Sequence, residues 1–142
     1  MSETVYDTRF LACANGNISN LRPFSQLQKR VSYVKEFSDG KTTARFNAKL
    51  LQEYDKHIKE YRNEIIESFF KLLVDHGIKS NRNTLTGPDW QRLDGAWPTH
   101  DRHLLAAAID GVKVRIITSE KDLVKKKAVV KRIFRIDVLL CE

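Results

Sequence analysis

Hydrophobic positions in the first half of the chain recur at the spacings typical of helices and strands. Residues 22–37 place apolar side chains every three or four positions, which predicts an amphipathic helix. Residues 47–77 repeat this spacing over a longer stretch, with Asn47 as a candidate N-cap and Gly77 at the end. That stretch predicts one long helix or two shorter ones. Between the two helical regions, residues 42–46 have the β-branched and aromatic composition of a strand.

The beginning and the second half of the chain extend this alternation. Residues 5–7 predict a short strand, and the apolar residues 10–14 either continue it or begin a turn. Residues 78–98 are rich in Asn, Gly and Pro, which predicts a long loop with one helical turn near Trp90. The elements predicted after this loop are a helix capped by Thr99 and closed by Gly111, a strand over 112–118, a helix over 121–131 and a strand over 133–139.

Strands and helices therefore alternate along most of the sequence, which favours a parallel sheet with helices on its faces. We expect an α/β fold of three layers, α/β/α, around a central and mainly parallel sheet. No internal repeat, low-complexity tract or linker divides residues 1–142, so we expect a single domain.

Composition narrows the classes of protein that remain. Hydrophobic residues make up 42% of the 142 residues, too many for a disordered chain. No apolar run approaches the ~20 residues needed to cross a bilayer, and residues 1–7 do not form a signal-peptide pattern. We therefore expect a cytoplasmic protein that does not enter the membrane. The two cysteines, Cys13 and Cys141, form no metal-binding or redox motif and are expected to be reduced and at least partly buried.

The net charge of +7 favours polyanions such as nucleic acid, but also other acidic partners. Residues 121–135 hold seven Lys or Arg residues. This stretch either binds an RNA backbone or is a solvated helix face, and the sequence favours neither over the other. Trp90 and Trp97 in the preceding loop suit stacking on bases, but capping of the core is the more common role of such residues.

Four carboxylates, Asp7, Glu53, Asp101 and Glu120, fall at strand ends or in the first turns of helices. In open α/β sheets, functional sites form at the carboxyl ends of the strands, so these four side chains can converge there. Carboxylates held close together repel one another unless a cation lies between them, and their oxygens suit Mg²⁺ or Mn²⁺. Taken singly, each has an ordinary alternative as a helix-end charge, a turn residue or part of a solvated face.

The segments that carry these carboxylates are VYDT at residues 5–8, LLQEY at 50–54, DRHLLAAA at 101–108 and IITSEKDL at 116–123. In this order they resemble the successive motifs of PIN domains, a ribonuclease family that includes the VapC toxins of bacterial toxin–antitoxin pairs. The resemblance spans nearly the whole chain. It implies a divalent-metal-dependent endoribonuclease that hydrolyses RNA phosphodiester bonds.

The resemblance also assigns roles to individual residues. It implies that the catalytic, metal-binding carboxylates are Asp7, Glu53, Asp101 and Glu120, with Asp122 as a further ligand of Mg²⁺ or Mn²⁺. It implies substrate contacts from Thr8, Arg9, Arg102, Thr118 and Lys121. RNA would be the substrate, and an acidic antitoxin protein and a second copy of the chain would be the partners.

Two positions depart from the usual family pattern and leave alternatives open. Arg9 stands where Asn or Ser is frequent, and Glu120 stands where Asp is usual, so its carboxylate reaches one methylene further. One alternative is a catalytically weak PIN-like module that binds nucleic acid or protein, which divalent metal binding would distinguish. Another is a flavodoxin-like or receiver-like domain, which leaves the Leu-Leu-x-Glu-Tyr segment unexplained. His100 and His103 flank Asp101 and suit phosphate contact or proton donation, although packing is the more common role.

Overall fold

The computed structural model describes residues 2–15, 24–58 and 63–141. Its centre is a five-stranded sheet in the order β3-β2-β1-β4-β5, and every pair of neighbouring strands is parallel. The strands are β1 (Ser2–Tyr6), β2 (Thr42–Phe46), β3 (Ile78–Lys79), β4 (Val114–Thr118) and β5 (Asp137–Leu140). The predicted α/β class and the parallel sheet are therefore confirmed.

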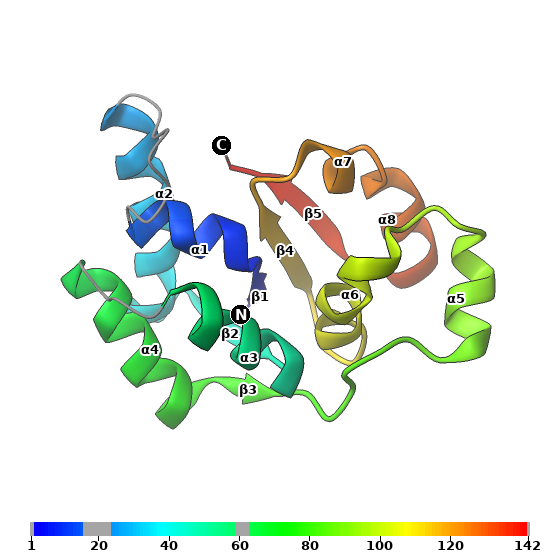
Figure 1. The fold of residues 1–142 in the computed structure, drawn as a ribbon, viewed down its shortest axis with the longest axis horizontal. Helices are drawn as coiled ribbons and strands as arrows, with labels where there is room; N and C mark the ends of the chain where they lie inside the picture. Colours follow the sequence, from blue (N-terminus) through cyan, green and yellow to red (C-terminus); the bar gives the residue numbers. More distant parts are fainter. Residues whose placement is uncertain (1, 16–23, 59–62, 142) are drawn as a thin grey trace.

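Helices cover both faces of the sheet (Figure 1). They are α1 (Thr8–Asn15), α2 (Phe24–Ser38), α3 (Ala48–His57), α4 (Glu64–His76), α5 (Gly87–Leu93), the 3-10 turn η1 (Thr99–Asp101), α6 (Arg102–Ile109), α7 (Lys121–Val124) and α8 (Lys127–Phe134). Helices α1, α2 and α4 lie on one face, while α6 and α8 lie on the other. This arrangement follows from right-handed crossovers that run in opposite directions from the central strand β1. It is the predicted α/β/α order of layers.

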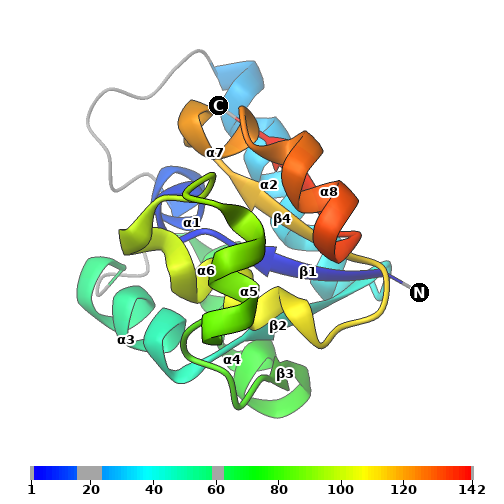
Figure 2. The ribbon, with the colours of Figure 1, turned by 90° about the vertical axis from the view of Figure 1, so that its right-hand side faces the viewer.

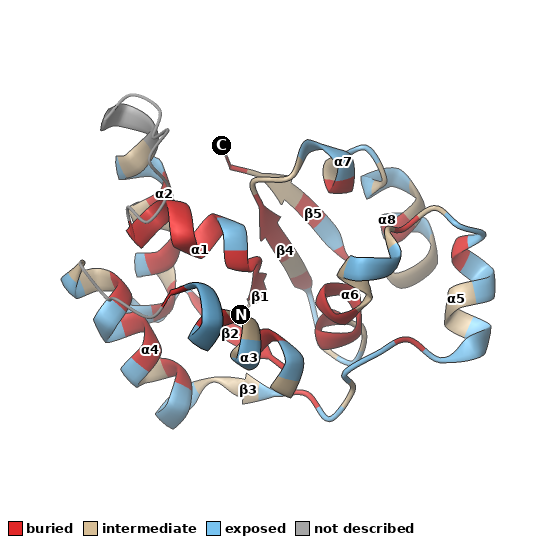
Figure 3. Cartoon of the chain, viewed as in Figure 1, coloured by how far each residue is buried: buried red, intermediate tan, exposed pale blue. Residues whose placement is uncertain are grey.

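The core lies where α1 and α6 pack on the central strands, and both helices are almost entirely buried (Figure 3). Three consecutive alanines, Ala106 to Ala108, let the backbone of α6 approach the sheet closely. Gly111 follows this helix at a crowded position, because a Cβ there would lie 2.2 Å from a methyl carbon of Val114. The sequence signal that ended the predicted helix at Gly111 therefore reflects a close approach of backbone to strand.

Several sequence predictions hold at the level of single residues. The strand predicted over 42–46 has those bounds. The stretch 47–77 forms two helices, α3 and α4, and the side chain of Asn47 accepts a hydrogen bond from the backbone N–H of Leu50 at 2.9 Å. Gly77 ends α4 as predicted. The helix predicted over 22–37 matches α2, and residues 22–23 and Tyr61 lie outside the described residues.

Other predictions are wrong for identifiable reasons. Residues 10–14 belong to helix α1, because a short apolar run fits a fully buried helix as well as a strand. The last strand begins at Asp137, since residues 133–134 complete α8. The predicted helix over 121–131 is divided into α7 and α8. The two-residue strand β3 lies within the predicted loop, and α5 is the helical turn expected near Trp90.

Two further expectations are met. Cys13 and Cys141 are both buried and form no disulfide. Among the helices of the described residues, none is long and apolar enough to span a membrane.

Candidate active site

The carboxyl ends of the central strands form the edge of the sheet on which the candidate site is built. The connections from β1 lead toward β2 on one side, and the chain later returns to β4 on the other side, so β1 and β4 flank the topological switch point. Crevices at such points are the usual binding places of open α/β sheets. Asp7 directly follows β1, and its backbone N–H donates to the carbonyl of Ile117 in β4 at 3.0 Å. The end of β1 is therefore fixed against β4.

A cavity of about 460 Å³ opens at this edge. Its lining consists of Asp7, Thr8, Arg9, Ala12, Glu53, His57, His100, Asp101 and Glu120. The four carboxylates predicted to be catalytic are all in this lining, although they come from four separate segments of the chain. We call this space the carboxylate pocket.

Asp7 is the most deeply placed acid of the pocket, with 7% of its surface exposed. The hydroxyl of Thr118 donates to its Oδ2 at 2.7 Å and accepts the backbone N–H of Glu120 at 2.9 Å. Burial raises the pKa of Asp7 to about 6, and repulsion by Asp101, Glu120 and Glu53 adds to this effect while the Thr118 hydroxyl opposes it. Because burial is the largest of these causes, a negative charge on Asp7 costs free energy in this pocket.

Glu53 is held by two side chains. Nε2 of the buried His103 lies in an ion-pair contact with its Oε1, and the hydroxyl of Thr8 donates to its Oε2 at 3.4 Å. Burial acts to raise the pKa of Glu53, but the hydrogen bond and charge of His103, with the Thr8 hydroxyl, outweigh it, so the pKa lies below its ordinary value. Glu53 is therefore kept ionised in the pocket.

Asn47 links α3, which carries Glu53, to α6, which carries His103. Besides capping α3, this fully buried residue donates from Nδ2 to the carbonyls of Arg82 and His103, each at 2.9 Å. One side chain thus satisfies three backbone groups from three segments. The position of Glu53 relative to α6 depends on this contact.

Asp101 lies at the entrance of α6, where η1 passes into the helix. Its backbone carbonyl accepts the indole N–H of the buried Trp97 at 2.8 Å, and its Oδ2 lies 3.1 Å from Nε2 of His100. Burial raises the pKa of Asp101, the two histidines His100 and His103 lower it, and Glu120 and Glu53 raise it further. Trp97 therefore anchors the backbone that presents this carboxylate, and its role is in the core rather than on a base.

Glu120 stands at the rim, paired with Arg9 through an Nη1 to Oε1 contact of 3.3 Å. The side chains of Arg9 and Glu120 are 60% and 41% exposed, so solvent weakens this ion pair and the two side chains can separate at little cost. The longer reach of glutamate at this position is consistent with its place at the rim.

Not every predicted contact residue lines the pocket. Asp122 is 81% exposed and pairs with Lys125 at 3.6 Å, and the exposed Lys121 is not in the lining either. The guanidinium of Arg102 stacks over the ring of Trp90 at 4.9 Å and donates to the carbonyl of Thr99. Thr118 is outside the lining and donates a hydrogen bond to Asp7. The structure thus brings Thr8 and Arg9 to the pocket and leaves the other predicted substrate contacts outside its lining.

Two residues make contacts at this site that the sequence does not predict. The sequence predicts Asn47 only as a helix cap, and His103 as a packing residue or as a phosphate contact or proton donor. His103 is 5% exposed and does pack in the core, but it also pairs with Glu53. Its place two residues after Asp101 was visible in the sequence, whereas its approach to α3 depends on how the two helices pack.

The carboxylate pocket suits a divalent cation in its chemistry. Its oxygen ligands are those that Mg²⁺ and Mn²⁺ prefer, and the mutual repulsion of the acids would be relieved by a positive ion. Within the described part of the chain, however, no three His, Cys, Asp or Glu side chains are gathered closely enough to hold a metal as they stand. Three of the acids are turned instead to His103, His100 and Arg9. The donors fit, and their side chains would have to move to meet an ion.

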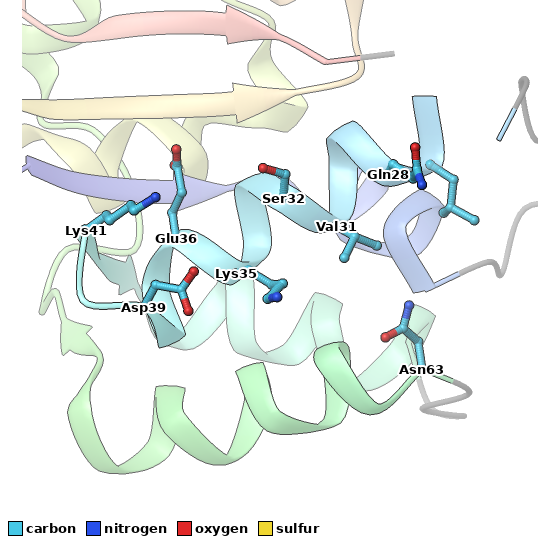
Figure 4. A pocket seen from close by; sticks show the side chains of 9 residues that line it. Gln28, Val31, Ser32, Lys35, Glu36, Asp39, Lys41 and Asn63 are labelled. Carbon is cyan, nitrogen blue, oxygen red and sulfur yellow. The ribbon is translucent and has the colours of Figure 1, made fainter. Parts of the chain in front are cut away.

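A second cavity, of about 500 Å³, runs along α2 and reaches the start of α4 (Figure 4). Its lining includes two carboxylates, Glu36 and Asp39, and two ammonium groups, Lys35 and Lys41. No charge of one sign dominates there, and Glu36 is already engaged by Arg115. The carboxylate pocket is therefore the stronger candidate site.

We found no match for this chain among protein-family models, curated proteins or solved structures.

Proposed function

We propose that this protein is a divalent-metal-dependent endoribonuclease with a PIN-like active site. The observation that supports this most is the meeting of Asp7, Glu53, Asp101 and Glu120 in one cavity at the switch point of the sheet. They belong to segments that resemble the ordered motifs of PIN domains. The basic net charge of +7 favours a polyanionic substrate.

In this proposal the four carboxylates would hold one or two Mg²⁺ or Mn²⁺ ions. A bound ion would supply charge neutralisation at the phosphodiester and lower the pKa of an attacking water. The Thr118 hydroxyl donates a hydrogen bond to Asp7, and the Thr8 hydroxyl donates one to Glu53. Glu53 is also in ion-pair contact with His103, so neighbouring side chains position two of the ligands. The exposed guanidinium of Arg9 can leave Glu120 and meet a phosphate at the rim.

The second candidate is a PIN-like module of weak activity that binds nucleic acid or protein. The absence of a ready metal cluster among the described residues favours it, together with the pairing of Glu120 to Arg9. An acidic antitoxin, a homodimer and a toxin–antitoxin setting remain part of the first proposal and rest on the resemblance alone.

The test is cleavage of single-stranded and structured RNA by the pure protein with Mg²⁺ or Mn²⁺, compared with EDTA. We expect metal-dependent cleavage that falls by at least about a hundredfold in Asp7→Asn and in Asp101→Asn. Asp75→Asn, which removes an exposed carboxylate on α4, is the matched control and should cleave as the parent does. If the folded parent protein cleaves no RNA and binds no divalent ion, the nuclease proposal fails and the binding module takes its place.

A further inference from the structure

The opposite edge of the sheet, where the strands begin, carries another charged cavity. It has a volume of about 430 Å³ and is lined by Ser2, Lys113, Arg115, Lys131, Arg135 and Asp137. Five of these residues stand at or next to the amino ends of β1, β4 and β5, and the sixth, Lys131, reaches the pocket from α8. We call it the amino-edge pocket. It shares no residue with the carboxylate pocket.

Its positive charge is only partly compensated. Four of the lining residues are cations and one is an anion. Lys131 pairs with Asp137 at 2.9 Å, and Arg115 pairs with Glu36 from outside the lining. Within the described residues, neither Lys113 nor Arg135 has a carboxylate within ion-pair distance. The pocket therefore presents two exposed cations without a counter-charge, which favours an anion.

The backbone at these same two residues is unusual. Lys113 has φ of 50° and Arg135 has φ of 59°, so both adopt the left-handed conformation that favours glycine. Among the described residues other than glycine, Asp94 alone shares this conformation, and a short Asp side chain tolerates it better. Two long cationic side chains thus occupy strained positions that a glycine would fill without strain, and both line one cavity. Strain of this kind is often retained for function.

A basic helical segment connects the two edges of the sheet. Helix α7 begins beside Glu120 at the carboxyl edge, and α8, which packs against β5 (Figure 1), runs toward the amino edge where β1 begins (Figure 2). Lys127 and Lys131 are exposed and lie one turn apart on α8, so they share a face of the helix. With about 1.5 Å per residue, this helix covers about 12 Å of the way to Arg135. Cations therefore follow the path between the two pockets.

We propose that the amino-edge pocket is a second site for RNA, which binds backbone phosphates of a strand that follows α8 from the carboxylate pocket. The identity of the ligand as RNA rests on the proposed function, whereas phosphate binding at this pocket does not require cleavage. Lys113 and Arg135 are the residues that make the site, because their charges are uncompensated. The basic stretch of residues 121–135 then serves as an RNA contact rather than only as a solvated face.

The test is binding of fluorescein-labelled oligouridylate to the full chain in EDTA, measured by fluorescence anisotropy over a range of salt concentrations. The variant is Lys113→Gly combined with Arg135→Gly, which removes both charges and also relieves the left-handed strain. We expect affinity to fall on the order of tenfold, and the slope of log K against log salt to become shallower by about 1.4, as for two lost phosphate contacts on a single strand. The variant should keep at least the thermal stability of the parent, so a loss of binding cannot come from a loss of fold.

Lys71→Gln combined with Lys79→Gln is the control of equal charge, since both lysines are exposed and lie away from this pocket. This control should bind oligouridylate more tightly than the glycine variant and with nearly the salt slope of the parent. Equal binding by the glycine variant and the parent would overturn the proposal. So would unchanged oligouridylate binding with lost binding of polyglutamate, which would assign the pocket to an acidic peptide.

The outcomes for the two proposals are separable. Loss of RNA binding in the glycine variant of a protein that cleaves no RNA and binds no divalent ion would support the amino-edge site and reject the nuclease. Metal-dependent cleavage by a protein whose RNA binding is unaffected by the glycine substitutions would support the nuclease and reject the amino-edge site.

Discussion

The two edges of the sheet hold charge in opposite ways. At the carboxyl edge the acids are partly or fully buried, and three of them are engaged by histidine or arginine side chains. At the amino edge the cations are more exposed, and two have no counter-charge among the described residues. The free energy cost at the carboxyl edge arises from burial and repulsion, which raise the pKa of Asp7. At the amino edge it arises from backbone strain at Lys113 and Arg135.

Helix polarity helps to explain the sign of charge at each edge, but not these costs. In a parallel sheet the following helices begin at the carboxyl edge and end at the amino edge. Anionic groups are favoured near helix beginnings and cationic groups near helix ends, so acids and bases are expected where they are found. Asp101 precedes α6 and Arg135 ends α8. The repulsion among buried carboxylates and the left-handed backbone at Lys113 and Arg135 go beyond this general preference. These two features point to function.

The largest effect is expected from neutralising Asp7. Its pKa is raised from 3.8 to about 6, so the folded protein binds a proton more tightly than the unfolded chain does between these pH values. Stability of the metal-free protein should therefore decrease as pH rises through this window. The difference corresponds to roughly 3 kcal/mol of unfolding free energy. Asp7→Asn keeps an acceptor for Thr118 and should be more stable than the parent above this window.

Urea unfolding of both proteins in EDTA at several pH values measures this difference. Asp75→Asn should show the pH dependence of the parent. If Asp7→Asn is equally or less stable at every pH, burial and repulsion at the carboxyl edge are not the costs described above.

A smaller effect is expected from the pairing of His103 with Glu53. His103→Leu fills the space in the core with an apolar side chain but removes the partner of Glu53. We therefore expect cleavage to fall by about tenfold. His103→Gln places an amide donor near the former Nε2 and should recover most of that loss. The measurement is the cleavage rate of each variant beside its melting temperature. Equal rates for Leu and Gln variants of similar stability would make His103 a packing residue alone.

The smallest effect is expected at the amino edge. Lys113→Gly and Arg135→Gly should each raise the free energy of unfolding by about 1 kcal/mol, because glycine adopts the left-handed conformation without strain. Lys113→Ala, which removes the charge but keeps a Cβ, should not share this gain. Thermal melts of the single variants decide the matter. A destabilised Lys113→Gly protein would mean that the lysine side chain contributes packing that exceeds the backbone cost.

The sequence was sufficient for the parts of the site that depend on local position. Asp7 follows a strand and Asp101 opens a helix, so their place at the carboxyl edge follows from topology alone. The contact between His103 and Glu53 depends on how α6 packs against α3, which no spacing along the chain encodes. The sequence does not predict the amino-edge pocket, because Lys113 falls within the strand predicted over 112–118 and Arg135 within the one predicted over 133–139. Left-handed backbone at a lysine or an arginine has no signature in the sequence.

Strand β1 has a consequence for the order in which the protein assembles. It pairs with β2 after only about one third of the chain, but its other neighbour is β4, and the bond from Thr118 to Asp7 spans 111 residues. A nascent chain therefore carries Asp7 and Glu53 long before Asp101 and Glu120 leave the ribosome. Contacts of such long range also slow folding, since much of the chain must be ordered before they form. The carboxylate pocket cannot assemble until the segment through Glu120 has left the ribosome, so the chemistry proposed for it would be absent before that point.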